Sequence, residues 1–182
     1  MRPRWFPSTI VVATHNPGKL GEWQTLLADL GVEVRSAKEL SLPEPEETES
    51  TYRGNARLKA RAAARQAGMP ALADDTGFEA MSLGGIPGVL TAPWASEQGG
   101  YPAALHEMLR RAGTGSQARL VCAVAFATSD EVVDAEAFVD GTIRAEPSDA
   151  PGFAALLNAN VPLMRDGVLA HRRAAFERLI SR

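Results

Sequence analysis

Short apolar runs and amphipathic segments alternate along this chain, starting with the β-branched run TIVVA at residues 9–13, which is typical of a buried strand. The next segment carries apolar residues at the spacing of one helix face: Leu20, Trp23, Leu27 and Leu30. Asn16 is placed to cap this helix, Pro17 to occupy its first turn and Gly31 to end it. The chain is therefore predicted to begin as a strand, a tight turn and a helix.

The pattern then predicts a strand, an acidic loop, a helix and a short strand, at residues 32–37, 40–50, 50–68 and 69–73. Prolines discourage regular structure in the acidic loop. Ala and Arg favour the helix, which Ser50 or Thr51 is placed to cap and Gly68 to end. The short strand is predicted to stop at two adjacent aspartates, which a Thr-Gly turn follows.

The second half predicts a Gly- and Pro-rich loop, a helix, two strands and a last helix, within residues 82–95, 101–113, 118–145 and 170–181. A turn near Ser129 and Asp130 would make the two strands antiparallel neighbours. Predicted helices and strands are interspersed along the whole chain, and the sequence contains no internal repeat. We expect one α/β domain with a mixed sheet over residues 1–182.

Composition narrows the class of protein. The chain has 182 residues, of which 45% are hydrophobic and 23% charged, as in soluble globular proteins. Its net charge of -3 provides no basic field for a nucleic acid polymer. No run is long enough to span a membrane, and residues 1–8 are not followed by a signal-like apolar core. The single Cys122 lies in an apolar run and is expected to be a buried thiol in a reducing cytoplasm.

The turn after the first strand clusters a hydroxyl, an amide and an ammonium, from Thr14, Asn16 and Lys19. Such a cluster at a helix N-terminus suits phosphate oxygens, although a capped helix with a solvated lysine would look the same. Asn55 and Lys59 are one helical turn apart and share a face, which is also compatible with an ordinary helix surface.

The adjacent carboxylates of Asp74 and Asp75 repel one another unless a cation or a basic neighbour offsets their charge. Oxygen ligands of this kind suit Mg²⁺, and Glu46 and Glu47 in the acidic loop could supply more of them. A solvated loop is the alternative for each carboxylate. His171 and Arg172 open the last predicted helix, where an anionic ligand or plain solvent would meet them.

Together these segments resemble the Ham1-like inosine triphosphate pyrophosphatase family, the enzymes that clear non-standard purine nucleoside triphosphates. The family pattern is S/T-x-N-x-x-K, an E-T-G-like acidic stretch, T-F-x-E-N-A-x-x-K-A, A-D-D-S-G-L and L-G-G-x-P-G-V. It is matched here by THNPGK, EETES, TYRGNARLKA, ADDTGF and LGGIPGV. Order and spacing agree over residues 9 to about 95.

The resemblance implies hydrolysis between the α and β phosphates, with Mg²⁺ as the cofactor and Mn²⁺ as its substitute. It implies that Asp75 accepts the proton and that Asp75, Asp74 and Glu46 bind the metal, with Glu47 as the alternative to Glu46. It implies substrate contacts from Thr14, His15, Asn16, Pro17, Gly18, Lys19, Asn55, Lys59, Thr76, Gly77, His171 and Arg172. It further implies an elongated mixed β-sheet flanked by helices, two lobes with the active-site cleft between them, and a cytoplasmic homodimer.

The chain departs from the family in the half that reads the base. Only Gly152-Phe153 matches the family's G-F-G-Y-D-P segment, no lysine follows Lys59, and Ala170 replaces the usual serine before His171. Asn158, Asn160 and the His171-Arg172 pair are the remaining candidates for contacts with a base edge or a 6-keto oxygen. Two alternatives stay open at this point: a pyrophosphatase with different base specificity, or a catalytically weak nucleotide-binding protein.

Overall fold

A curved sheet of seven strands forms the spine of the molecule in our computed structural model, which describes residues 3–181. The strands are β1 (Thr9–Val12), β2 (Glu33–Ser36), β3 (Ala71–Ala80), β4 (Ile86–Gly88), β5 (Gln117–Ala127), β6 (Val132–Ile143) and β7 (Leu157–Asn158). Their order is β2-β1-β3-β5-β6-β7, and β4 pairs with β3. β1 is parallel to β2 and β3, whereas the other pairs are antiparallel, so the predicted mixed sheet is confirmed.

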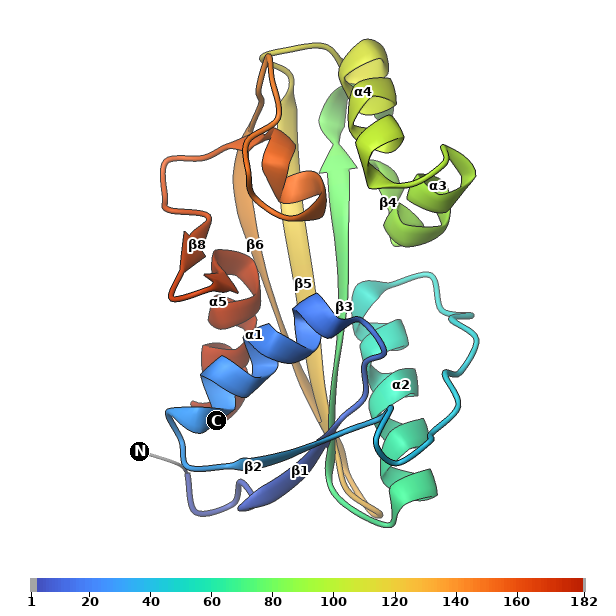
Figure 1. Cartoon of the computed structure of the whole chain (residues 1–182), viewed down its shortest axis with the longest axis vertical. Helices are drawn as coiled ribbons and strands as arrows, with labels where there is room; N and C mark the ends of the chain where they lie inside the picture. Colours follow the sequence, from blue (N-terminus) through green and yellow to red (C-terminus); the bar gives the residue numbers. More distant parts are fainter. Residues whose placement is uncertain (1–2, 182) are drawn as a thin grey trace.

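The helices are α1 (Pro17–Ala28), α2 (Tyr52–Ala67), α3 (Thr91–Glu97), α4 (Tyr101–Ala112) and α5 (Ala170–Ile180). Figure 1 shows α1 and α5 on one face of the long strands, α2 on the other, and α3 and α4 near their far end. Two short 3-10 helices, η1 (Met81–Leu83) and η2 (Gly152–Leu156), and the hairpin β8 (Met164–Arg165) and β9 (Val168–Leu169) complete the described chain.

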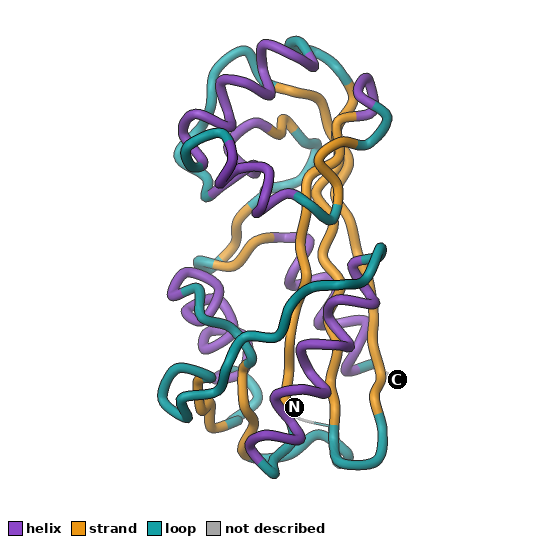
Figure 2. Tube along the Cα trace, turned by 90° about the vertical axis from the view of Figure 1, so that its right-hand side faces the viewer, coloured by secondary structure: helices purple, strands orange, loops and turns teal. Residues whose placement is uncertain are grey.

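The core is divided into three apolar clusters by this arrangement. One lies under α1 and α5, a second lies between α2 and the sheet, and a third lies under α3, α4 and η2. The views along two directions show an elongated molecule whose helices gather around the two ends of β3, β5 and β6 (Figures 1 and 2). The described chain is thus organised as two groups of helices on one continuous sheet.

The predicted helix starts are confirmed by their capping contacts. The Asn16 side chain accepts from the backbone N–H groups of Gly18 and Lys19, and Pro17 is the first residue of α1. Thr51, rather than Ser50, caps α2 by accepting from an N–H group of its first turn. These short polar side chains satisfy donors that a helix start leaves without partners.

The predicted end of the short strand at the aspartates is wrong. β3 runs from Ala71 to Ala80, and all ten of its residues pair with β5, so Thr76 and Gly77 continue the strand instead of turning. Gly77 is required there because a Cβ atom would lie 2.4 Å from the Gly88 carbonyl oxygen and 2.5 Å from the Tyr52 ring. The carboxylates are tolerated inside a sheet because each has basic partners, described below.

The prediction of a long loop at residues 82–95 is wrong in part. This segment contains the end of η1, strand β4 and the start of α3. Pro87 lies in β4, which among the described strands pairs with β3 alone, so the missing N–H of this proline removes no ladder hydrogen bond at the free edge. Pro93 occupies the first turn of α3, where a proline nitrogen would have no helical partner anyway. The antiparallel strands joined near Ser129 and Asp130 are confirmed as β5 and β6.

Candidate functional site

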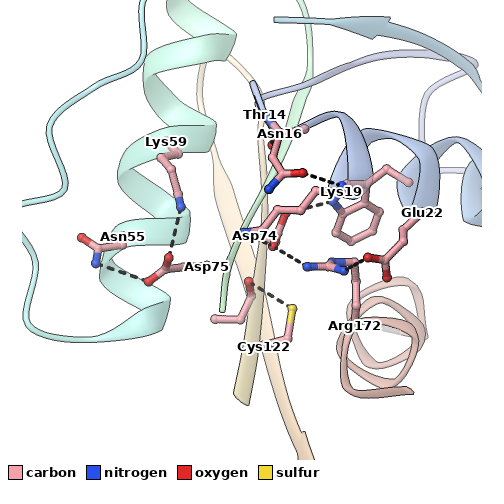
Figure 3. Close-up of polar contacts among 12 residues, drawn as sticks. Thr14, Asn16, Lys19, Glu22, Asn55, Lys59, Asp74, Asp75, Cys122 and Arg172 are labelled. Atoms are coloured by element: carbon pink, nitrogen blue, oxygen red, sulfur yellow. Dashed lines mark hydrogen bonds and ion pairs between the residues drawn. The ribbon is translucent and has the colours of Figure 1, made fainter. Parts of the chain in front are cut away.

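The carboxylates of Asp74 and Asp75 point to opposite faces of the sheet, as successive side chains of a strand do. Figure 3 shows Asp74 directed toward α1 and α5, and Asp75 directed toward α2. Both are buried, with side-chain exposures of 1% and 7%. The two charges therefore do not form one acidic pair. Each belongs to its own polar cluster, one on either side of β3.

Asp74 is surrounded by donors. Its Oδ1 accepts from Trp23 Nε1 at 2.9 Å, and its Oδ2 lies 2.9 Å from Lys19 Nζ and 3.3 Å from an Arg172 nitrogen. Burial alone would raise the pKa of Asp74, but Lys19 and Arg172 hold this pKa well below its usual range. Asp74 is thus a charged, fully engaged group that fixes the two cations of this face.

Glu22 is a functional residue that the sequence analysis missed. It is buried on α1, its Oε1 lies 2.5 Å from Arg172 NH1, and its Oε2 accepts from the Leu169 backbone N–H at 2.8 Å. It therefore joins α1 to the start of α5 and orients the Arg172 guanidinium between two carboxylates. One feature of the sequence could have indicated Glu22: it lies three residues after Lys19, so both side chains lie on one face of the helix.

The cluster on the α2 face has a different charge balance. Asp75 Oδ1 lies 3.2 Å from Lys59 Nζ, and Asp75 Oδ2 accepts from Asn55 Nδ2 at 3.3 Å. Glu47 from the acidic loop also reaches Lys59, at 3.0 Å. Two carboxylates thus share one ammonium, which leaves an excess of negative charge on this face.

The protonation of this second cluster follows from its burial. Burial raises the pKa of Asp75, and the nearby Glu47 adds to this effect, while Lys59 opposes it. Burial by itself would lower the pKa of Lys59, but the carboxylates of Asp75, Asp74 and Glu47 outweigh it and raise that pKa. A carboxylate with a raised pKa holds a proton more readily than an ordinary aspartate. Asp75 is therefore better suited to accept a proton than Asp74.

An open edge of β3 connects the two faces. The ladder with β1 stops at Leu72, the ladder with β4 begins at Phe78, and among residues 3–181 no strand pairs with β3 between them on that side. The Leu72 carbonyl oxygen accepts a hydrogen bond from the backbone N–H that follows β1. The Phe78 N–H points to the same edge, where it donates to the Thr91 hydroxyl. Since backbone groups alternate along a strand, those of Asp74 and Thr76 face this opening. Lys19 lies on one face of this part of β3 and Lys59 on the other.

A pocket of about 300 Å³ opens on the α1 and α5 face. The predicted binding residues that line it are Asn16, Gly18, Lys19, Thr76, Gly77, His171 and Arg172. His171 and Arg172 are each only 2% exposed, so they are not the solvated helix surface considered as an alternative. Burial and the Arg172 charge together lower the pKa of His171 to about 3, so this imidazole is neutral near pH 7. The far side of the pocket is formed by β5, α4 and η2.

Other predicted residues lie outside this pocket. His15 Nε2 is 3.0 Å from the Leu42 carbonyl oxygen, so the His15 ring contacts the acidic loop. Thr14 braces the turn by accepting from the Asn16 N–H, and Pro17 is exposed at the helix start. Glu46 is exposed, whereas its neighbour Glu47 reaches Lys59.

The two asparagines proposed for base contacts are both exposed. Asn158 lines a separate hollow together with Arg144, Ser148 and Met164. Asn160 lines neither this hollow nor the 300 Å³ pocket. The structure therefore gives neither side chain a place in the pocket that holds Lys19 and Arg172.

The residues on the α2 face fit a divalent cation bound together with a phosphate. Within residues 3–181, no three His, Cys, Asp or Glu side chains gather closely enough to hold a metal ion by themselves. Mg²⁺ is commonly held by one or two carboxylates plus substrate phosphates and water, so such a group is not required. Asp75 and Glu47 supply two carboxylates beside the open edge of β3, and their excess negative charge favours a cation there.

Comparison with known sequences gives one consistent result. Residues 10–154 match the family model described as the Ham1 family. The chain is 41% identical over 197 residues to the dITP/XTP pyrophosphatase of Rhodospirillum centenum, covering 99% of this chain and 97% of that protein. It is 47% identical over 152 residues to the dITP/XTP pyrophosphatase of Bradyrhizobium sp., covering 79% and 71% of the two chains.

Solved structures give the same result for the fold. A HAM1 protein from Coxiella burnetii superposes with a TM-score of 0.77 at 29% identity, covering 96% of this chain and 98% of that one. The nucleoside-triphosphatase and dITP/XTP pyrophosphatase of Mycobacterium abscessus superposes with a TM-score of 0.65 at 31% identity, covering 95% of each chain. The similarity therefore extends over nearly the whole described chain, including the C-terminal part that holds His171 and Arg172.

Proposed function

This chain belongs to the Ham1 family, and we propose on that basis that it hydrolyses non-standard purine nucleoside triphosphates, such as ITP, dITP and XTP, to the nucleoside monophosphate and pyrophosphate. The observation that carries the proposal is the presence of cationic side chains on both sides of the open β3 edge. Lys19 and Arg172 lie on one face, and Lys59 lies on the other. A triphosphate crossing this edge would have cations on both sides.

Asp75 is the group that we assign to proton transfer. Water adds across the anhydride between the α and β phosphates, the bond to the bridging oxygen breaks, and Asp75 accepts the proton that the water loses. Its pKa, which burial raises and Lys59 at 3.2 Å lowers in part, supports this role. Asn55 orients the same carboxylate through its contact with Oδ2.

The proposed phosphate contacts come from the first turn of α1 and from the start of the last helix, α5. The amide N–H groups of the α1 start and the Lys19 ammonium lie beside the pocket, where the positive end of the helix dipole favours an anion. Arg172 is held in place by Asp74 and Glu22, so its guanidinium is already oriented before a ligand arrives. His171, which lines the same pocket, stays neutral and can donate from one ring nitrogen.

We assign Mg²⁺ to the α2 face, with Mn²⁺ as its substitute. Asp75 and one acidic-loop glutamate, Glu47 or Glu46, would hold it together with the phosphates. Bound there, the ion would neutralise phosphate charge and activate water. The contacts of Asp74 with Trp23, Lys19 and Arg172 support a positioning role for Asp74 instead.

We further propose that the protein works as a cytoplasmic homodimer that binds no nucleic acid polymer. The net charge of -3 supports the last point, and within the described residues no helix has the length and apolar character to cross a bilayer. Light scattering after size-exclusion chromatography would test the dimer, and a monomer peak across micromolar concentrations would contradict it.

The experiment that tests the function is a panel of nucleoside triphosphates incubated with Mg²⁺, in which pyrophosphate and orthophosphate are measured separately. We expect pyrophosphate and the monophosphate as the initial products for ITP, dITP and XTP. Orthophosphate as the first product, or no turnover with either Mg²⁺ or Mn²⁺, would overturn the proposal.

A further inference from the structure

The 300 Å³ pocket has two chemically different ends. Lys19, His171 and Arg172 line one end, which is cationic and polar. Tyr101, Leu120 and Phe153 line the other, and they come from α4, β5 and η2. Figure 1 places α1 and α5 in one group of helices and α4 and η2 in the other, so the pocket joins the two groups. A ligand with anionic and aromatic ends has a defined direction in such a pocket.

Phe153, the one aromatic residue retained from the family's base-reading segment, is only 3% exposed. It stacks on Phe78 with ring centroids 5.0 Å apart and planes inclined by 19°. Trp94 packs against it at 5.9 Å. Most of its ring surface is therefore committed to the core cluster under α3 and α4, and little of it remains for a ligand.

Tyr101 is placed differently. Its side chain is 41% exposed, and its ring meets Phe153 edge-on at 5.9 Å with an interplanar angle of 66°. It is the first residue of α4 and follows two glycines in the left-handed region, Gly99 and Gly100. On the other side, a Cβ at Gly152 would lie 3.4 Å from the Tyr101 ring, so the ring rests closely against the η2 backbone. The ring is thus braced on one side and open to the pocket on the other.

Few polar side chains at this end are free to read the edge of a base. The Thr91 hydroxyl accepts from the Phe78 N–H and donates to the Gly88 carbonyl, so both of its functions are in use. Asn158 lines a different hollow. Stacking on an aromatic ring tolerates any base, because every base presents a π-face.

Resting on the proposed function, we propose that Tyr101 is the ring on which the purine of the substrate stacks, and that it takes over this task from the incomplete base segment. The residue sets the affinity for the base with little preference for its edge. Binding of the base and binding of the phosphates are therefore separable: Tyr101 serves the first, and Lys19 and Arg172 serve the second.

The test measures binding of two probes by titration calorimetry. IMP carries the base and a single phosphate, whereas inorganic tripolyphosphate carries no base. We expect Tyr101→Ala and Tyr101→Leu to raise the Kd of IMP about tenfold or more, within the range that aromatic-to-alanine changes produce for stacked bases. Tyr101→Phe should stay within about threefold of the parent, and the Kd of tripolyphosphate should stay within about twofold in all variants.

Two controls make the result specific. Tyr101→Leu keeps apolar cover on Phe153 and so preserves the fold if Tyr101→Ala loosens it. Trp5→Ala removes another aromatic side chain that is 41% exposed but lies against Phe126, away from this pocket, and should leave both Kd values unchanged. The proposal is overturned if IMP binds the folded Tyr101→Leu variant as tightly as the parent, or if tripolyphosphate weakens as much as IMP.

The role of Tyr101 and the hydrolytic activity are tested by different measurements. Absence of turnover by the parent would overturn the hydrolytic function, while the calorimetric comparison would still decide whether Tyr101 binds the base. A parent that binds tripolyphosphate but not IMP would overturn the role of Tyr101. Turnover of ITP with equal kcat/KM in the parent and Tyr101→Leu would overturn the role of Tyr101 alone.

Discussion

Asp74 and Asp75 are neighbours in the chain, yet their carboxylates face opposite sides of β3 and bind different lysines. Asp74 lies 2.9 Å from Lys19, and Asp75 lies 3.2 Å from Lys59. Because successive side chains of a strand point to opposite faces of the sheet, two charges that would otherwise repel each other are separated. It also divides their proposed tasks: Asp74 would order the face assigned to phosphate binding, and Asp75 would serve the proposed metal and proton transfer.

The first prediction distinguishes these tasks by isosteric substitution. Asp75→Asn should lower kcat by roughly 10²–10⁴, because the amide neither accepts the proton nor binds the metal. Asp74→Asn should lower the free energy of unfolding by about 3–5 kcal/mol, because it leaves the buried Arg172 and the partly buried Lys19 without their shared carboxylate. Steady-state pyrophosphate release and urea unfolding, measured for both variants, check this division. Equal losses of activity and stability in the two variants would contradict it.

The second prediction concerns the acid stability contributed by His171, whose pKa burial and Arg172 lower to about 3 in the folded protein. The unfolded chain takes up this proton below about pH 6.5, so between these values the unfolded state holds more protons. Stability from this residue is therefore present above about pH 6.5 and is lost as the pH falls toward 3, by on the order of 2–4 kcal/mol.

Asp75 acts in the opposite direction in part of this range, because burial raises its pKa. The readout is accordingly the difference between the parent and His171→Gln in urea unfolding at pH 7.0, 5.5 and 4.5. We expect the parent to lose more stability than the variant at each step down in pH. Parallel curves for the two proteins would show that His171 does not carry this dependence.

The third prediction tests the close approach at Gly77. A methyl group there would meet the Gly88 carbonyl oxygen at 2.4 Å and the Tyr52 ring at 2.5 Å, so Gly77→Ala should destabilise the protein by about 1–3 kcal/mol or more. Gly21→Ala is the matched control, since among the described residues no heavy atom outside its chain neighbours and its own helix backbone lies within 4 Å of the added Cβ on α1. That change should stabilise the helix by roughly 0.5–1 kcal/mol. Thermal unfolding of both variants decides, and a Gly77→Ala variant as stable as the parent would refute the prediction.

The fourth prediction concerns His15, which contacts the acidic loop through the Leu42 carbonyl at 3.0 Å and lies 3.7 Å from Glu44. Removing this contact frees the loop that carries Glu46 and Glu47. His15→Ala should raise the Mg²⁺ concentration for half-maximal activity about two- to tenfold, equivalent to one hydrogen bond of roughly 0.5–1.5 kcal/mol. The rate at saturating Mg²⁺ should be unchanged.

The control for this prediction is His106→Ala, because His106 is an exposed histidine of α4, remote in sequence from the acidic loop. It should leave the Mg²⁺ dependence as it is in the parent. If His15→Ala and His106→Ala titrate alike with Mg²⁺, then His15 does not position the metal-binding loop.

Much of the site was visible in the sequence because its residues lie close together in the chain. The Asn16 cap and the Lys19 side chain belong to one helix start, and Asn55 and Lys59 are one helical turn apart. Local backbone preference is enough to bring such residues together. Contacts between these segments and parts of the chain far from them in sequence could be inferred only from the resemblance to a family.

The sequence by itself determined where α1, α2, α4 and α5 begin and which side chains share one helix face, because capping and periodicity act over a few residues. Tertiary structure alone decided that β3 continues through the aspartates, since pairing with β5 and salt bridges to three cations outweigh the local signal for a turn. It also decided the contacts of Trp23 with Asp74 and of Glu22 with Leu169, across 51 and 147 positions of the chain. No local rule relates residues so far apart, and only the packing of α1 and α5 on one face of the sheet brings them within hydrogen-bonding distance.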